Sequence, residues 1–400
     1  MKLPHGLHLA YCTNIHRGES WAETLDNLQR HTLAVRERVA PDEPYAIGLR
    51  LGVLAAKELS DPSALLAFQR WLERHQCYVF TFNGFPYGKF HGARVKEQVY
   101  APDWTAPERL EYTCLLFDIL SQLVPLGVEG SVSTVPVSFK EFMKEARQEA
   151  VARGHLWACV ERLEKLTRRT GKTLHLGLEP EPLCHLETTP ETVAFFDRMR
   201  ADRPGDLRLA EHLGVNYDCC HLAVEFETAS VSLSKLRECG IRLSKVHLSS
   251  ALRLHPDPQA RHALHAFAED TYFHQVVARD DHGKITRFRD LPDALALHNH
   301  LPPSLSEEWR IHFHVPLHAT PASPLLTTSE HVTQTLDWLK ANTGACSHLE
   351  METYTWEVMP GEMKNRSVVD QLVGEYQWCL HELARRGLAA PRFLRSETSR

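Results

Sequence analysis

The chain has 400 residues and a mass of 45.6 kDa, which is enough for one large α/β barrel or for two to three average domains. Its 45 Lys and Arg residues against 51 Asp and Glu residues give a net charge of −6, which argues against a dedicated nucleic-acid-binding protein, since such proteins carry a basic excess. The sequence has no apolar stretch long enough to span a bilayer, so we expect no membrane insertion. Histidine is unusually frequent, with 25 residues, and this raises the question whether several of them converge on one site.

The ten cysteines are scattered singly, apart from the neighbours Cys219 and Cys220, and no Cys-x-x-Cys motif occurs. In a chain of this size, that pattern is typical of reduced, buried thiols. The N-terminal segment Met1–His5 does not begin an apolar run of the kind found in signal peptides. We therefore expect a cytoplasmic protein.

Short apolar runs alternate with longer helical patterns over most of the chain. The helical patterns begin at capping signals such as Ser20-x-x-Glu23 and Thr105-x-x-Glu108. Eight strands that each precede a helix are expected at Leu7–Thr13, Tyr45–Leu51, Tyr78–Phe82, Gly130–Val135, Leu174–Glu179, Gly214–Asp218, Leu243–Ser249 and His348–Thr353.

This alternation breaks in an insertion at about residues 250–309. Within it, Tyr272–Arg279 and Lys284–Asp290 predict a β-hairpin (272–290), and strand-like Arg310–Val315 follows. Without these segments, eight β-then-α units remain, which predict a single (β/α)₈ TIM barrel over residues 1–390 and a flexible tail at 391–400. An open doubly wound sheet is the alternative, but Tyr11–Gly18, after the first strand, has no Gly-x-Gly-x-x-Gly phosphate loop.

Polar residues at the carboxyl ends of barrel strands carry function in TIM barrels. Four of the expected strands have such residues at or near their ends: Glu179, Asp218, His247 and Glu352. Taken singly, a strand-end carboxylate is more often a helix cap, and a lone histidine is more often part of the core. Three carboxylates and a histidine on one axis are costly without a cation, and this donor set suits Mn²⁺, Co²⁺, Zn²⁺ or Mg²⁺. The set as a whole therefore predicts a divalent metal site.

Three further histidines are candidates for a second metal or for substrate contact. His221 follows Asp218 by three residues, and His312 and His314 lie on one side of their expected strand.

The long loop Asn83–Trp104 is expected to be a lid over the substrate. Lys89, His91 and Lys96 would then give cationic contacts, whereas the alternative is a solvated surface loop. Asn14 and His16 close the first strand and are expected at the same mouth. The hairpin either covers the site or forms an oligomer contact, and the sequence leaves both open.

The candidate site residues and three longer segments resemble those of known families. Glu179, Asp218-x-x-His221, His247 and Glu352 resemble the metal-site order of the xylose isomerase-like TIM-barrel superfamily, which holds sugar isomerases, epimerases and endonuclease IV-type repair enzymes. More closely, three segments resemble the EboE family of metabolite traffic proteins: Leu9–His16, Phe82–Gly92 and Glu350–Trp356.

The resemblance implies that Glu179, Asp218, His247 and Glu352 bind one divalent ion. It also implies that Glu179 and Glu352 act as acid and base, exchanging a proton at the carbon beside a carbonyl. His312-x-His314 stands where the repair enzymes carry an Asp-x-His metal pair. Those enzymes also use histidines from early strands, and Phe82-Asn83 and Ser133-Thr134 supply none here.

Three hypotheses for the function follow. The first is a metal-dependent isomerase or epimerase acting on a sugar, cyclitol or related polyhydroxylated metabolite, free or phosphorylated, in metabolite biosynthesis or traffic. The second is a non-catalytic metabolite-binding or pathway protein, and the third is a metal-dependent phosphoester hydrolase of the endonuclease IV kind. The intact pair Glu179 and Glu352 favours an enzyme of the first kind, and the acidic net charge disfavours the third.

Overall fold

The computed structural model describes the whole chain except residues 93, 299–306, 362, 365 and 395–400. Eight parallel strands form a barrel in the order β1-β13-β7-β6-β5-β4-β3-β2, and a parallel bridge between Cys12 and Gly48 brings its two ends together. The expected TIM barrel is therefore confirmed. The bounds of these strands are β1 His8–Tyr11, β2 Tyr45–Arg50, β3 Cys77–Asn83, β4 Gly130–Thr134, β5 Leu174–Leu178, β6 Leu213–Asp218, β7 Arg242–Leu248 and β13 His348–Met351.

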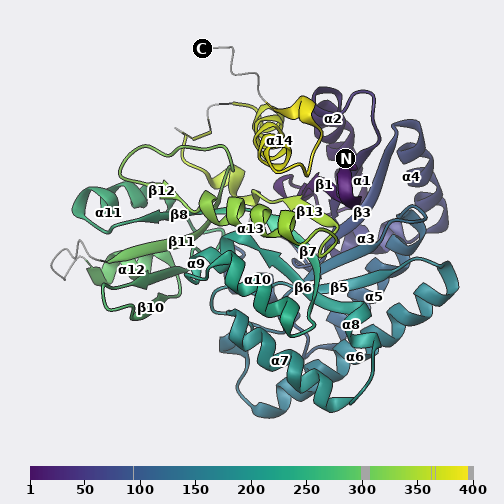
Figure 1. Cartoon of the computed structure of the whole chain (residues 1–400), viewed down its shortest axis with the longest axis horizontal. Coiled ribbons are helices and arrows are strands. Elements are labelled where there is room, and N and C mark those ends of the chain that lie inside the picture. The colour runs from purple at the N-terminus through teal and green to yellow at the C-terminus, as the bar shows by residue number, and fades with distance from the viewer. Residues whose placement is uncertain (93, 299–306, 362, 365, 395–400) are drawn as a thin grey trace.

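Helices surround the barrel strands on the outside (Figure 1), and the main apolar core lies between the two layers. None of the helices in the described ranges combines the length and the apolarity that crossing a bilayer requires. The helices are α1 Trp21–Asn27, α2 Leu33–Val39, α3 Val53–Leu59, α4 Pro62–Arg74, α5 Pro107–Leu123, α6 Ala146–Thr170, α7 Thr189–Asp202, α8 Arg208–His212, α9 Cys219–Val224, α10 Ala229–Glu238, α11 Pro258–Leu264, α12 Leu291–His298, α13 Ser329–Ala341 and α14 Val368–Arg385.

Local sequence signals mark some of the ends of these helices, but one of the expected caps is absent. Ser20 and Glu23 form the expected capping box at α1, and α6 ends at Gly171, whose φ of 69° is the left-handed conformation that glycine adopts without strain. The cap expected at Thr105 is wrong. Ala106 is the N-cap of α5, and the Thr105 hydroxyl donates instead to Asp103 Oδ1 at 2.5 Å.

A second, antiparallel sheet of five strands lies beside the barrel, at the left of Figure 1, in the order β10-β9-β11-β8-β12. The expected hairpin is present as β9 (Val276–Arg279) paired with β10 (Ile285–Phe288). The other three strands are β8 Ser250–Leu254, β11 Glu308–Val315 and β12 Leu326–Thr327. β8 was not predicted, because the expected strand ends at Ser249, the one residue that separates β8 from β7.

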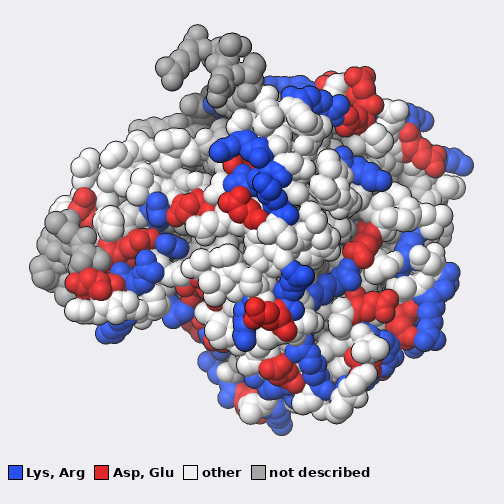
Figure 2. All heavy atoms as spheres, in the orientation of Figure 1, with Lys and Arg blue, Asp and Glu red and all other residues white. Residues whose placement is uncertain are grey.

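Charge is distributed differently outside and inside the molecule. On the face drawn in Figure 2, acidic and basic side chains are interspersed over the surface. Inside the barrel, in contrast, the Glu350 carboxylate is fully buried, and a Cβ atom at Gly48 would lie 1.9 Å from its Oε1. The glycine therefore leaves room for an acidic group in the barrel interior.

Candidate metal centre and substrate pocket

Four side chains meet at the carboxyl ends of the barrel strands, and we call them the metal quartet: Glu179, Asp218, His247 and Glu352. One possible ligand atom from each lies within 4.8 Å of those of the others, and all four residues are buried. Nδ1 of His247 lies 3.0 Å from Glu179 Oε1, 3.3 Å from Asp218 Oδ2 and 3.1 Å from Glu352 Oε2. The structure thus brings together the four residues that the sequence singled out as metal ligands.

The quartet has more negative charge than the protein itself balances. Oε2 of Glu179 is buried without a hydrogen-bond partner among the described residues. Burial by itself lowers the pKa of His247, but the carboxylates of Glu352 and Glu179 raise that pKa well above its ordinary value. Three carboxylate oxygens and one imidazole nitrogen are ligands that Zn²⁺, Mn²⁺, Co²⁺ and Mg²⁺ accept, so the residues fit a divalent cation.

Local structure fixes the orientation of Asp218, the last residue of β6. Its Oδ1 accepts hydrogen bonds from the His221 backbone N–H at 2.9 Å and from the Ser249 hydroxyl at 2.8 Å, which caps α9. One oxygen thus serves the helix cap, and the other faces the quartet. The cap role that the sequence offered for Asp218 is therefore present, and it leaves Oδ2 of the same carboxylate facing the quartet.

A buried ion pair beneath the quartet supports His247. Nε2 of His247 lies 2.8 Å from Glu350 Oε2, and the same oxygen lies 2.5 Å from Lys245 Nζ, which also donates to Ser133 Oγ at 3.1 Å. Burial raises the pKa of Glu350, but Lys245 and His247 lower it to about 2. Glu350 is therefore ionised and directs Nδ1 of His247 to the quartet, as the outer carboxylate of a metal-bound histidine does.

Sequence reasoning assigned no role to Lys245 or Glu350, although a signal was present. Lys245 precedes His247 by two residues, as Glu350 precedes Glu352, and residues two apart in a strand share a face.

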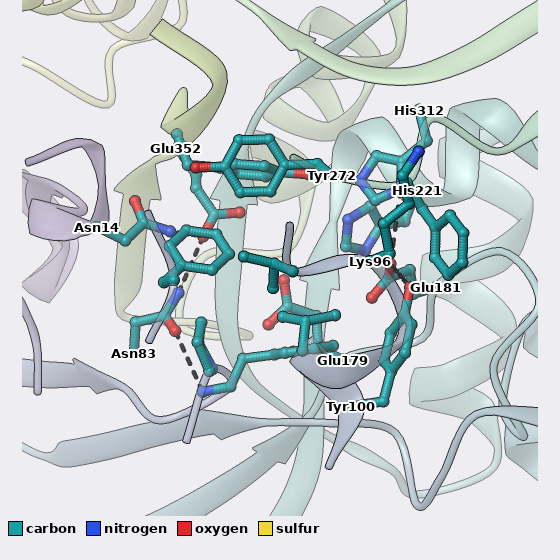
Figure 3. A pocket seen from close by; sticks show the side chains of 17 residues that line it. Asn14, Asn83, Lys96, Tyr100, Glu179, Glu181, His221, Tyr272, His312 and Glu352 are labelled. Atoms are coloured by element: carbon teal, nitrogen blue, oxygen red, sulfur yellow. Dashed lines mark hydrogen bonds and ion pairs between the residues drawn. The ribbon is translucent and has the colours of Figure 1, made fainter. Parts of the chain in front are cut away.

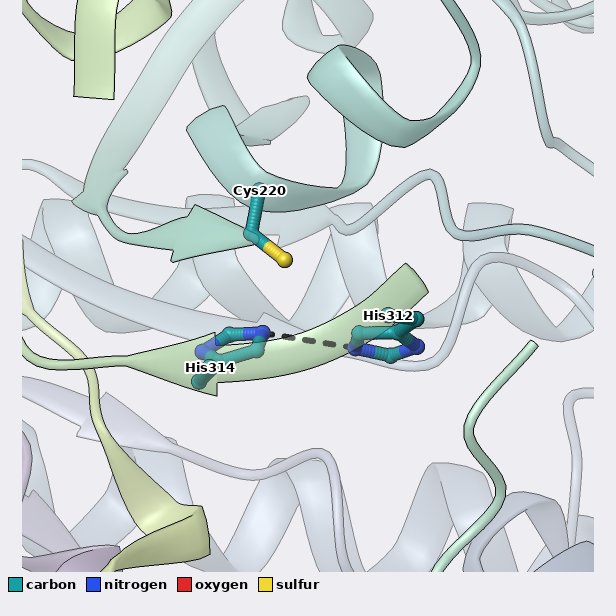
Figure 4. A group of neighbouring side chains, drawn as sticks. All are labelled: Cys220, His312 and His314. Atoms are coloured by element: carbon teal, nitrogen blue, oxygen red, sulfur yellow. Dashed lines mark hydrogen bonds between the residues drawn. The ribbon is translucent and has the colours of Figure 1, made fainter. Parts of the chain in front are cut away.

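Three more histidines, His221, His312 and His314, form a histidine cluster next to the quartet. Two groups of possible ligand atoms within 4.8 Å of one another involve this cluster: Asp218 with His221 and His314, and Cys220 with His312 and His314. In Figure 4 the Cys220 side chain points from its helix toward the two rings on β11, whose Nε2 atoms lie 3.3 Å apart.

All three rings of the histidine cluster use Nδ1 for a contact with a protein oxygen. The partners are Pro180 O at 3.0 Å from His221, Gln275 Oε1 at 2.7 Å from His312, and Glu352 O at 3.0 Å from His314. Carbonyl oxygens only accept, so each Nδ1 carries a proton, and Nε2 has a lone pair wherever the ring is neutral. Metal-bound histidines are oriented in the same way.

A pocket opens above the quartet, with about 510 Å³ of empty space when the part open to solvent is included. Its polar floor is formed by Asn14, Asn83, Glu179, Glu181, His221, His312 and Glu352. In Figure 3, Asn14 and Asn83 flank Glu352 on one side, and Glu181 and His221 lie on the other side. The two asparagine amides donate to Glu352 Oε1, at 2.8 Å from Asn14 and 2.9 Å from Asn83.

Glu181 and Asn83 are floor residues that sequence reasoning did not propose. Asn83 is the last residue of β3, so its position at a strand end was the available signal. Glu181 lies in the loop after β5, and the Tyr100 hydroxyl donates to it at 2.6 Å. Burial raises the pKa of Glu181 to about 7.

The residues expected to form a cationic lid lie in different places. Lys96 lines the pocket, but its ammonium is paired with Asp290. His91 is buried, with Nε2 at 2.6 Å from Asn14 O and Nδ1 at 2.6 Å from the Tyr272 hydroxyl.

Lys89 and His16 do not line the pocket, and neither does His91. Lys89 is exposed, and His16 is buried, where it stacks on His31 with ring centroids 4.6 Å apart. Of the residues expected at the mouth, Asn14 and Lys96 line the pocket, whereas His16, Lys89 and His91 do not.

Neither a protein-family model nor a curated protein matches this chain. Among solved structures, the chain is similar to a xylose isomerase domain protein from Planctomyces limnophilus, with 12% identity, a TM-score of 0.50, and coverage of 96% of this chain and 98% of that one. A second is a xylose isomerase-like TIM barrel protein from Mycobacterium smegmatis in complex with magnesium, with 13% identity, a TM-score of 0.48, and coverage of 95% and 97%. A third is the IOLI protein with a binding zinc atom, with 12% identity, a TM-score of 0.47, and coverage of 95% and 99%.

The first of these similarities shows the fold, which is a TIM barrel. At 12% identity it says nothing about the reaction, so the function is argued from this chain's own side chains.

Proposed function

We propose that the protein is a metal-dependent isomerase or epimerase that exchanges a proton at a carbon beside a carbonyl of a small hydroxylated metabolite. The observation that carries this proposal is the metal quartet, in which two glutamates from different strands meet an aspartate and a histidine within 4.8 Å at the floor of a pocket. Paired carboxylates that face one substrate are the groups such a proton exchange requires.

The two glutamates of the quartet are held differently. Glu179 has its Oε2 free of hydrogen bonds from the described residues, so this atom can take up a proton. Glu352 receives two amide hydrogen bonds at Oε1, which fix its orientation and favour its ionised form. A divalent ion bound by the quartet would supply positive charge that polarises the substrate oxygens. Asn14 and Asn83 then position Glu352, while Glu179 exchanges the proton.

The metal content of the purified protein tests the site. We expect the wild-type protein to retain a divalent metal and the variants Asp218→Ala and Glu352→Gln to lose it, as measured by inductively coupled plasma mass spectrometry. Glu375→Gln is the matched control, because Glu375 is also a buried glutamate but lies outside the quartet. Unchanged metal in both quartet variants would contradict the proposed site.

The reaction is tested by carbon-bound proton exchange. Candidate hydroxy ketones and hydroxy aldehydes, free and phosphorylated, are incubated with the protein in D₂O, and deuterium incorporation is followed by NMR. We expect Glu179→Gln to abolish the exchange. A Glu179→Gln variant that keeps full function in cells would indicate a metabolite-binding protein instead.

We also propose that the histidine cluster binds a second divalent ion. Its support is the shared orientation of the three rings, which engage protein oxygens through Nδ1, and their closeness to Asp218 and Cys220 as possible further ligands. The test is metal stoichiometry, which we expect to fall from two ions to one in His314→Asn. One ion per chain in both the wild-type protein and His314→Asn would contradict a second metal site and favour substrate contact as the role of the cluster.

The finer assignment to the EboE family of metabolite traffic proteins is part of this proposal. It rests on the segments Leu9–His16, Phe82–Gly92 and Glu350–Trp356. Each segment contributes a residue to the pocket lining: Asn14, Phe90 and Glu352 are examples.

A further inference from the structure

We propose that this site takes a substrate with one oxygen-rich end and an apolar remainder, and that it does not recognise a phosphate group. The inference rests on the proposed function, because it assigns the oxygen-rich end to the floor that holds the quartet. It differs from the expectation of a substrate that is hydroxylated throughout.

The lining of the pocket is divided by chemistry. Polar side chains form the floor, whereas the outer wall is formed by Phe85, Pro86, Phe90, Val95, Val99 and Phe273. Most of this wall comes from the loop after β3, and Phe273 comes from the insertion that precedes β9. Apolar walls of this kind bind ligands by removing apolar surface from water, which is worth about 25 cal/mol per Å².

Aromatic rings also stack on sugars, so the polar groups of the wall decide between a sugar and an apolar moiety. Three tyrosine hydroxyls lie in the lining, and each already has a protein partner. Tyr100 donates to Glu181 at 2.6 Å, Tyr272 lies 2.6 Å from His91 Nδ1, and Tyr354 lies 3.4 Å from His312 Nε2. Pro86, Val95 and Val99 offer no side-chain hydrogen bond at all. A hydroxyl group in the outer half would lose its hydration without regaining equivalent hydrogen bonds.

Among the residues in the described ranges that line it, the pocket also offers a phosphate no unpaired lysine or arginine. Of the residues in the described ranges that line it, Lys96 is the one lysine or arginine. The ammonium of Lys96 is paired with Asp290, and its side chain is 5% exposed. Phosphate recognition relies on arginine or lysine donors or on exposed backbone N–H groups at a helix N-terminus, and here the single cation is used inside the protein.

Two arginines, Arg50 and Arg109, donate hydrogen bonds to backbone oxygens of the loop after β3. The guanidinium of Arg50 donates hydrogen bonds to Gly18 O at 2.9 Å and to Gly88 O at 2.6 Å. The guanidinium of Arg109 donates to Gly84 O at 2.8 Å and to Phe85 O at 3.0 Å. These contacts hold the apolar wall in place, so the cations fix its shape and do not face the ligand.

Three probes with the same hydroxymethyl ketone end test this inference. They are 2-hydroxyacetophenone, dihydroxyacetone and dihydroxyacetone phosphate, which differ only in the group attached to the ketone. Isothermal titration calorimetry with the full-length protein in Mn²⁺ is expected to show the phenyl ketone binding at least about 10-fold more tightly than either of the others, since burial of a phenyl group is worth one to two factors of ten in affinity.

Variants of Val99, which is partly exposed, connect this preference to the wall. Val99→Thr keeps the volume and adds a hydroxyl, and Val99→Asn adds an amide. Both are expected to weaken binding of 2-hydroxyacetophenone about 3-fold or more and to leave dihydroxyacetone unchanged. Val39→Asn is the control, since Val39 is also partly exposed but lies outside this pocket.

Equal affinities for 2-hydroxyacetophenone and dihydroxyacetone, or tightest binding of dihydroxyacetone phosphate, would overturn the inference. Repeating the titrations after EDTA treatment separates it from the proposed function. A protein that never holds metal but still prefers 2-hydroxyacetophenone contradicts the metal-dependent function and supports the apolar wall. A metal-loaded protein without that preference overturns the apolar wall alone.

Discussion

Two groups of buried histidines lie at opposite ends of the barrel, and their surroundings differ. The lower group, His8, His175 and His348, lies near the amino ends of β1, β5 and β13. The upper group, His247 and the histidine cluster, lies at the carboxyl ends, where Glu179, Asp218 and Glu352 meet. The comparison teaches that several converging carboxylates, rather than the histidines themselves, distinguish a candidate metal centre from core packing, since His175 of the lower group also has a carboxylate oxygen, Glu129 Oε2, at 3.5 Å.

The lower group behaves as part of the core. Nδ1 of His8 lies 2.7 Å from the Tyr78 hydroxyl, and Nδ1 of His348 lies 2.7 Å from Ser131 Oγ. The Phe80 ring packs between these two histidines, with centroids at 5.4 and 4.8 Å. Burial lowers the pKa of His8 and of His175 to about 4, so both rings are neutral at neutral pH.

The largest expected difference between the two groups is in metal binding. We expect His247→Asn to weaken binding of Mn²⁺ or Zn²⁺ more than about 100-fold, because it removes a ligand, whereas loss of an outer partner costs about 10–100-fold. His175→Leu in the lower group is expected to leave the affinity unchanged. Competition with a fluorescent chelator measures both, and equal losses in the two variants would show that the comparison is mistaken.

A smaller effect is expected from the ion pair beneath the quartet. Glu350→Gln removes the charged partner of His247 Nε2, and we expect metal affinity to fall about 10–100-fold. Because this change leaves Lys245 without its carboxylate, the double variant Lys245→Met/Glu350→Gln is needed to separate binding from stability. The midpoint temperature of thermal unfolding should return toward the wild-type value in the double variant, while its metal affinity stays low. Wild-type affinity in Glu350→Gln would mean that this glutamate does not orient His247.

The smallest effect concerns acid stability and the lower group. The pKa of His175 falls from its ordinary value of 6.5 to about 4 on folding, so the unfolded chain binds more protons between these values. The free energy of unfolding therefore decreases as pH falls from about 6.5 toward 4. Between pH 7 and pH 5, the free energy of unfolding of His175→Leu should fall by about 1–2 kcal/mol less than that of the wild-type protein, as measured by urea denaturation. The same decrease in the free energy of unfolding in both proteins would mean that His175 does not contribute to the acid sensitivity.

Much of the barrel could be predicted from local patterns, and the elements that were missed have two causes. The strand ends at Glu179, Asp218 and Glu352 were visible because apolar runs stop there. The short helices α3 and α8 were missed, since seven or five residues give too little periodicity for a helical pattern. The hairpin was expected, but its place in a five-stranded sheet depends on long-range pairing with β8 and β11.

For the candidate site, the sequence by itself determined which residue types stand at the strand ends. The alternation of strands and helices predicts a parallel barrel, and in a parallel barrel the carboxyl ends of all strands lie at the same end. Only the tertiary structure decided what surrounds those residues. Lys245 meets Glu350 across neighbouring strands, Lys96 meets Asp290 instead of a ligand, and Phe273 from the insertion completes a wall begun by Phe85. These contacts join segments far apart in the chain, and pairing over such distances is set by the closed barrel rather than by any local pattern.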